Sequence, residues 1–120
     1  MHDPDLKRRT KRFALDIIKF IEALPKDETC RVLGRQLLRA GTSVGANYRA
    51  ACRARSNADF ISKMGIVEEE ADESSYWLEL LTEDGKVVEP KSAPLLKEAN
   101  ELLAITVSSI NTARKSGARS

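Results

Sequence analysis

Five of the six arginines in residues 30–56 are the side chains of this sequence best suited to chemistry with a partner. The same segment contains no Asp or Glu. On a helix, at about 100° per residue, these arginines fall on the side opposite an apolar sector. A guanidinium is planar, permanently charged and well matched to phosphate oxygens. The five residues are Arg31, Arg35, Arg39, Arg49 and Arg53.

The arginines have two interpretations. They contact phosphates of a nucleic acid, or they form a solvated face that pairs with carboxylates of the next helix, including across a subunit interface. Aromatic residues make up only 5% of the chain, so few are available to stack on bases. Nucleic-acid binding would then depend on backbone charge and be weakly sequence-specific.

A second basic cluster lies near the N-terminus. Its positive charges are unfavourable there, because the N-terminus is the positive end of the helix dipole. It is either a frayed, solvated terminus or a basic arm that extends the same binding surface. Its members are Lys7, Arg8, Arg9, Lys11 and Arg12.

Residues for catalysis are scarce. The only histidine is His2, which excludes the usual di-iron set, histidine-based triads and histidine-containing zinc sites. The stretch 41–45 lacks the lysine and the preceding strand of a phosphate-binding loop. Cys30 and Cys52 do not have the spacing of a metal or redox motif. We therefore expect no enzymatic activity, no metal and no cofactor.

Composition favours a single helical domain over residues 1–120. Charged residues make up 32% of the chain, with a net charge of only +2, so local clusters of charge matter more than the total. No segment approaches the ~20 apolar residues of a membrane helix. Two cysteines are too few for a disulfide scaffold, so we expect reduced thiols and a cytoplasmic location, with no membrane partner.

Apolar periodicity predicts four helices, at residues 4–24, 27–54, 57–84 and 92–113, followed by a basic, flexible tail at 114–120. Asp3 before Pro4 fits a helix start, Asp27 or Glu28 can open the second helix, and Ser56 with Asp59 has the form of a capping box. Short connections between amphipathic helices predict an all-α, antiparallel up-down-up-down four-helix bundle.

The second predicted helix must pass through Gly41 and Gly45, each costing about 1 kcal/mol relative to alanine. We predict that it continues, because the apolar phase set by Leu37 is resumed unchanged by Val44. The two glycines belong to a strip of small residues that lets another backbone approach closely, either within the bundle or between subunits. We assign both to a candidate oligomer interface.

The third predicted helix has the strongest periodicity, a heptad seam formed by Phe60, Met64, Val67, Ala71, Ser74, Leu78 and Leu81. Trp77 and Ile66 lie on its shoulder and indicate a second contact surface, which we also assign to the oligomer interface. Asn47 is the polar residue in the core sector of the second helix. We expect it to be paired in a structural polar core, with Glu70 or Ser74 as candidate partners.

Three stretches resemble a known family: residues 36–48 (QLLRAGTSVGANY), Ser56-x-x-Asp59-Phe60-Ile61, and residues 70–81 (EADESSYWLELL). They are similar to the four-helix-bundle proteins encoded in intervening sequences of large-subunit ribosomal RNA genes, sometimes labelled S23-like ribosomal proteins. The resemblance implies a continuous second helix, an antiparallel bundle and, as in characterised relatives, a ring-shaped homopentamer. It implies no settled enzymatic activity. The family often has Pro at the position of Gly45 and Glu-Gly at residues 50–51.

A related branch is the accessory variability protein of diversity-generating retroelements, a basic pentameric barrel that binds nucleic acid and a reverse transcriptase. Our hypothesis is therefore a non-enzymatic homo-oligomer that associates with structured RNA or an RNA–protein complex. The alternative is a protein-interaction scaffold or a reverse-transcriptase accessory subunit.

Overall fold

A computed structural model describes residues 4–119, which form four helices: α1 (Pro4–Glu22), α2 (Glu28–Cys52), α3 (Asn57–Glu83) and α4 (Glu89–Arg119). The described part of the chain contains no strand, and the fold is the predicted all-α four-helix bundle. Within the described residues, no helix is both long and apolar enough to cross a bilayer. The bundle is elongated, with extents of 53 × 22 × 20 Å.

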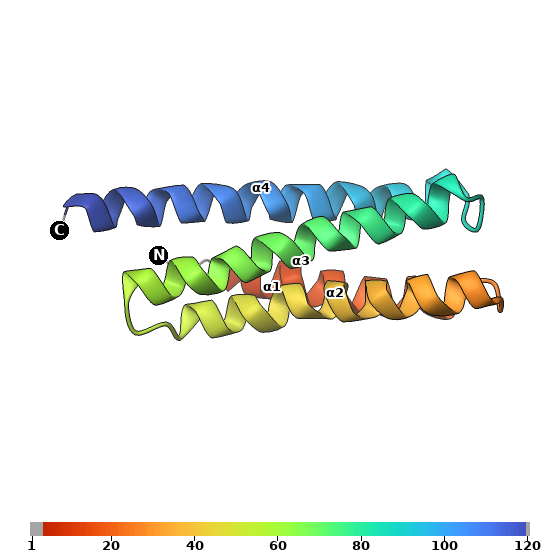
Figure 1. The fold of residues 1–120 in the computed structure, drawn as a ribbon, viewed down its shortest axis with the longest axis horizontal. Helices are drawn as coiled ribbons and strands as arrows, with labels where there is room; N and C mark the ends of the chain where they lie inside the picture. Colours follow the sequence, from red (N-terminus) through yellow and green to blue (C-terminus); the bar gives the residue numbers. More distant parts are fainter. Residues whose placement is uncertain (1–3, 120) are drawn as a thin grey trace.

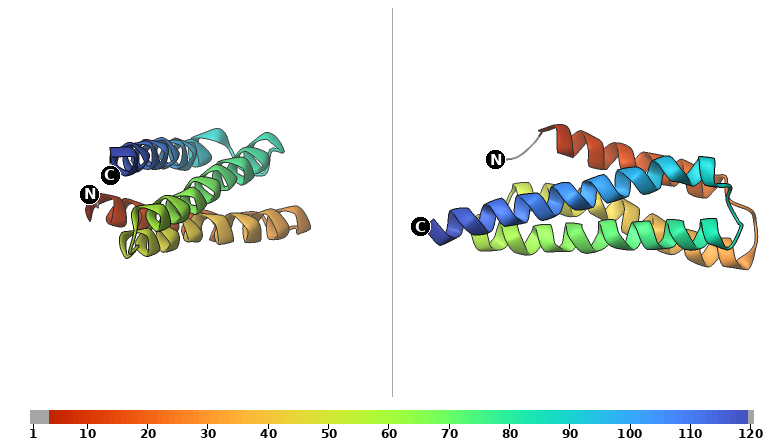
Figure 2. Two further views of the ribbon diagram at one scale, coloured as in Figure 1. Left: turned by 60° about the vertical axis from the view of Figure 1, so that its left-hand side comes forward. Right: turned by 90° about the horizontal axis from the view of Figure 1, so that it is seen from above.

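Successive helices run in opposite directions along the long axis of the bundle (Figure 1). α2 packs on both α1 and α3, and α3 also packs on α4. α1 and α4 contact each other over only a short stretch, and Figure 2 shows them lying apart along much of their length. α1 is therefore held mainly by α2, and the α1/α2 contact sets the geometry of the candidate site.

The core is formed by the apolar faces that the periodicity predicts. Five residues of the α3 seam are almost completely buried together with Ser74, and Phe60 is half-buried at its start. Large side chains from all four helices fill the centre, which removes apolar surface from water and supplies the main driving force for folding. They include Phe13, Ile17, Leu37, Val44, Met64, Leu78, Leu81 and Leu102.

Two predicted helix starts are confirmed by their hydrogen bonds. The Asp27 carboxylate accepts a hydrogen bond from the Cys30 backbone N–H at 2.8 Å, and the Ser56 hydroxyl accepts one from the Asp59 N–H at 3.0 Å. Both side chains satisfy backbone donors that a helix N-terminus leaves free. The predicted first cap, Asp3, lies outside the described residues.

α2 is one uninterrupted helix through Gly41 and Gly45, as predicted. Tertiary packing outweighs the low helix propensity of glycine here, since both glycines are buried against α1.

α4 differs from the prediction at both ends. It begins at Glu89 rather than at residue 92, because Pro90 is tolerated in a first turn, where its missing N–H costs nothing. It also continues to Arg119, so residues 114–119, which were predicted to follow the helix as a tail, are part of it; Ser120 lies outside the described residues. Asn57 Nδ2 donates a hydrogen bond to the Ala113 carbonyl at 2.7 Å, which ties these last turns to the start of α3.

Candidate nucleic-acid interface

A groove between the first half of α1 and the second half of α2 gathers four cationic side chains. Its volume is about 450 Å³. Lys7, Arg8 and Lys11 line it from α1, and Arg49 lines it from α2. We call this pocket the basic groove. Small residues complete its lining: Thr10, Ala14, Thr42, Gly45 and Ala46.

The floor of the basic groove exists because α1 and α2 approach closely at the glycines of α2. A Cβ atom at Gly45 would lie 3.2 Å from Thr10 Oγ1 and 3.4 Å from the Thr10 backbone carbon. A Cβ at Gly41 would lie 3.0 Å from two side-chain carbons of Ile17. Both glycines therefore belong to the contact between α1 and α2 of one chain, which corrects their assignment to the oligomer interface.

No ion pair within residues 4–119 neutralises the cations of the basic groove. None of the salt bridges in this part of the chain involves Lys7, Arg8, Lys11 or Arg49. None of the residues that line the groove is acidic. Four like charges around one concave surface create a positive potential that attracts anions, most strongly phosphates.

Arg9 does not join the basic groove, which corrects its assignment as a nucleic-acid contact. Its guanidinium turns to α4 and donates to Glu98 at 2.7 and 3.0 Å and to Glu101 at 3.1 Å. The hydrogen bond to Glu98 is the main cause of a raised pKa for Arg9. The residue therefore connects the two helices that otherwise contact each other least.

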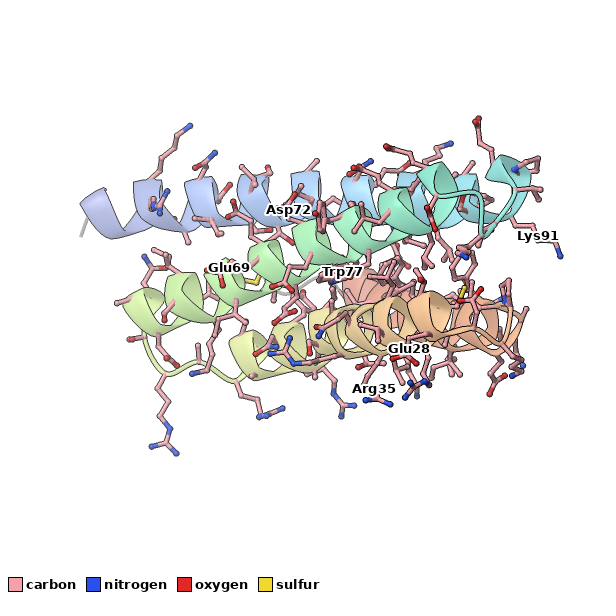
Figure 3. All side chains as sticks on the ribbon, turned by 45° about the vertical axis from the view of Figure 1, so that its right-hand side comes forward. Glu28, Arg35, Glu69, Asp72, Trp77 and Lys91 are labelled. Atoms are coloured by element: carbon pink, nitrogen blue, oxygen red, sulfur yellow. The ribbon has the colours of Figure 1, made fainter. Side chains whose placement is uncertain are left out.

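The remaining predicted cations are dispersed over α1 and α2, and two of them pair with acids of their own helix. Arg12 pairs with Asp16 at 3.5 Å, and Arg31 pairs with Glu28 in the first turn of α2. Figure 3 shows Arg35 and Glu28 on the side of α2 that faces away from α3. Arg53 donates to the Arg49 carbonyl at 3.3 Å.

Arg31 and Arg35 line a second pocket of about 630 Å³ near the α1–α2 turn. Its other lining residues include Leu38 and Gly34 of α2, Ile21 of α1 and the acidic Asp27 and Glu28. The structure therefore divides the predicted basic surface into two clusters at opposite ends of one helix pair. Arg39 belongs to neither, because it lies toward α3, where its charge acts on Glu70.

The predicted polar core does not form as one network. Asn47 is half-buried, and its Nδ2 donates to the Ser43 carbonyl of its own helix at 2.9 Å. Ser74 is fully buried and donates to the Glu70 carbonyl at 2.8 Å, also within its own helix. Among residues 4–119, no hydrogen bond joins the side chain of Asn47 to Glu70 or Ser74. Backbone carbonyls one turn earlier satisfy both side chains instead.

The α2/α3 surface has two polar atoms that are buried without a hydrogen-bond partner, Glu70 Oε1 and Trp77 Nε1. Burial raises the pKa of Glu70; nearby Glu73 adds to the increase, while Arg39 opposes it. Trp77 projects from α3 toward α2 (Figure 3). Ile66 on the same helix is 37% exposed and Val32 on α2 is 46% exposed. We call these four residues, Glu70, Trp77, Ile66 and Val32, the α2/α3 patch.

Sequence reasoning identified the cations of the basic groove but missed the residues that shape it. Thr10, Ala14, Thr42 and Ala46 form its small-residue lining. The sequence did contain a pattern that could have predicted them. Thr10 and Ala14 lie one turn apart on α1, and α2 carries a corresponding strip of small residues that lets the two helices pack closely. The side chains of residues 4–119 contain no group of three His, Cys, Asp or Glu residues arranged to hold a metal ion.

The fold and its basic groove define a small helical-bundle protein with an anion-attracting surface. The family model of the 23S rRNA-intervening sequence protein matches residues 2–108. The chain therefore belongs to the family of 23S rRNA-intervening sequence proteins, which confirms the predicted family.

A solved structure gives the same result. It is a protein of unknown function from the S23 ribosomal protein family of Bacteroides thetaiotaomicron, 35% identical in sequence to this chain, with a TM-score of 0.85. The match covers 92% of this chain and 99% of the other. No curated protein matches the chain with significant similarity.

Proposed function

We propose that this protein is a non-enzymatic, homo-oligomeric RNA-associating protein of the cytoplasm, and that its basic groove contacts the phosphates of structured RNA or of an RNA–protein complex. The observation that carries the proposal is the set of four cations, from two helices, around one groove without a carboxylate. The family description, which refers to an intervening sequence of 23S rRNA, supports RNA as the polyanion.

The chemistry of the groove fits backbone recognition. Lys7 and Lys11 are one helical turn apart and face Arg49 across the groove. Lysine binds phosphate as a point charge, and arginine adds a planar pair of donors. Binding of this kind releases condensed counterions and is therefore strongly salt-dependent.

A gel-shift assay at low salt tests the proposal with the double variant Lys11→Glu/Arg49→Glu. We expect it to lose RNA retention, because two favourable charges become unfavourable. The control is Lys91→Glu/Lys97→Glu, which makes the same charge change at exposed lysines of α4 and should retain RNA. Equal retention by both variants would contradict a role for the basic groove.

Self-association through the α2/α3 patch is the second part of the proposal, with a ring-shaped homopentamer as the expected assembly. The exposed aliphatic side chains of Ile66 and Val32 support it, because a neighbouring copy that covers them removes apolar surface from water.

Sedimentation velocity tests this assembly. Ile66→Glu/Val32→Glu should shift the protein toward monomer, because the two charges would be buried in the interface. Val107→Glu, at an α4 residue of equal exposure to Ile66, should leave the assembly unchanged. If both proteins sediment like wild type, the α2/α3 patch is not the interface.

The alternative function is a protein-interaction scaffold, including an accessory subunit of a reverse transcriptase, in which the arginines serve protein contacts. In this alternative, the dispersed arginines pair with carboxylates of neighbouring copies. Purified protein that binds no RNA at low salt, yet still assembles, would favour this alternative over RNA association.

A further inference from the structure

The basic groove is one end of a longer seam between α1 and α2. On α1, the residues at spacings of four, three, four and three are Lys7, Lys11, Ala14, Ile18 and Ile21, which places them in one line along the helix. The first three line the basic groove, and Ile21 lines the second pocket near the α1–α2 turn. The two pockets therefore lie along a common line.

The corresponding line on α2 runs in the opposite direction through Arg49, Thr42, Leu38 and Arg31, at spacings of seven, four and seven. Arg49 and Thr42 line the basic groove, and Leu38 and Arg31 line the second pocket. The second end is less basic than the first, because Asp27 and Glu28 also line that pocket and Arg31 pairs with Glu28. Among the described residues, Lys26 and Arg35 are its cations without an ion pair.

Three aliphatic side chains lie on or beside the middle of the seam. Leu38 and Ile18 belong to its two lines, and Leu15 lies one turn after Lys11. Leu38 is 38% exposed and Leu15 is 48% exposed, and Ile18 is half-buried. We call these three residues the aliphatic strip. Exposed leucines between the basic groove and Arg35 indicate a ligand with charges at intervals and an apolar surface between them.

We propose that the ligand of this seam is an unpaired RNA segment, such as a loop or bulge, with phosphates at the basic groove and at Arg35 and bases over the aliphatic strip. This inference rests on the proposed function and names the RNA structure that the site accepts. Arg35 and Arg49 are 14 residues apart on α2, or ~21 Å at the rise of a helix. That span suits a strand of roughly four or more nucleotides, within the range of single-strand sites.

An RNA duplex fits the seam less well. Its bases are stacked inside, so it would press its charged backbone and 2′-hydroxyl groups against the aliphatic strip. Placing charge on apolar surface loses hydration without compensation. The faces of unstacked bases, in contrast, can cover Leu15 and Leu38 and remove their apolar area from water.

Fluorescence anisotropy with two probes at the same salt concentration tests the inference. The probes are an unstructured oligouridine of about 12 nucleotides and a blunt RNA duplex of about 12 base pairs, lengths that span a typical single-strand site. Leu15→Ser/Leu38→Ser should weaken binding of the single strand by roughly tenfold and leave duplex binding within about twofold. Both leucines are exposed, so the variant should fold, which circular dichroism verifies.

Two controls separate the inference from the proposed function. Val88→Ser/Val107→Ser removes exposed aliphatic surface elsewhere and should change neither affinity. Lys11→Glu/Arg49→Glu should weaken both probes. If the leucine variant binds both probes like wild type, or loses both equally, while the charge variant is weak, the unpaired-strand inference is overturned and the proposed function stands. If neither probe binds wild type at low salt, the proposed function fails with it.

Discussion

The guanidinium of Arg9 on α1 makes a two-point contact with the carboxylate of Glu98 on α4, with hydrogen bonds of 2.7 and 3.0 Å. The contact links two helices that share only a short interface. Both side chains are about 30% exposed, so solvent screens the pair only in part. The residue that the sequence places in a binding arm thus has a structural role.

Replacing Arg9 by alanine should therefore lower stability without lowering RNA affinity. We expect a loss of roughly 1 kcal/mol in the free energy of unfolding, the scale of a partly exposed pair with two charge-assisted hydrogen bonds. Lys11→Ala should show the reverse, with weaker RNA binding and unchanged stability. Urea denaturation and anisotropy measure the two effects. A loss of RNA affinity for Arg9→Ala equal to that of Lys11→Ala would contradict this division of roles.

Two glycines in helix interiors should respond in opposite ways to alanine. A Cβ added at Gly65 on α3 would meet no atom within 4 Å, so Gly65→Ala should raise stability by about 0.5–1 kcal/mol. Gly41→Ala would place its Cβ 3.0 Å from fully buried Ile17, whose branched side chain has little freedom to move. We expect Gly41→Ala to be less stable than Gly65→Ala by at least about 1 kcal/mol, measured by denaturation. Equal stability would show that α1 is not held so closely to α2.

The cap of α2 should make stability depend on pH. The hydrogen bond from the Cys30 backbone N–H is the main cause of a lowered pKa for Asp27, below its ordinary 3.8, and Lys86 contributes at 3.3 Å. A carboxyl whose folded pKa is lowered stabilises the fold above its ordinary pKa, and this contribution is lost as pH falls through the folded value. Asp27→Ala should thus lower the Tm at pH 7.

The same cap predicts how that difference behaves in acid. The gap in Tm between wild type and Asp27→Ala should narrow as pH falls below about 4, as wild type loses the charged cap. Asp27→Asn, which keeps an acceptor oxygen without the charge, should lie between the two at pH 7. A gap that stays constant from pH 7 to pH 2 would contradict an ionised cap.

The end of α4 should depend on Asn57. Its hydrogen bond to the Ala113 carbonyl is 2.7 Å long, and Gly117 passes so close that a Cβ there would lie 2.7 Å from Asn57 Nδ2. Asn57→Ala should increase hydrogen exchange in the last turns of α4 and leave exchange near Ala99 in its centre unchanged. Unchanged protection in the last turns would show that Asn57 does not hold them.

Sequence periodicity was sufficient for the helices and for most of the core, because heptad spacing on α3 and amphipathic spacing on α2 leave one arrangement that buries both apolar faces. It could not predict the end of α4, where a single side chain from α3, Asn57, contacts residues that are polar and small. The helical state of that segment depends on a tertiary contact rather than on its own pattern.

The candidate site was predictable in its charges and not in their grouping. Lys11 and Arg49 are cationic by residue type, and their spacing predicts that they face outward. Only the packing of α1 on α2 places them around one groove. Spacing likewise could not predict the ion pair between Arg9 and Glu98, which is 89 residues away in the chain. Pairing between distant helices depends on how they rotate about their axes, which a single helix does not specify.

The salt dependence of RNA affinity is the most direct test of the central claim, that the basic groove binds phosphates. For wild type, log affinity should fall with log salt concentration with a slope of several units, since each phosphate contact contributes about −0.7 to −0.9. Lys7→Ala/Lys11→Ala/Arg49→Ala should reduce that slope by roughly two to three units, whereas Lys91→Ala/Lys97→Ala/Lys115→Ala should preserve it. An identical slope for wild type and both triple variants would contradict the account.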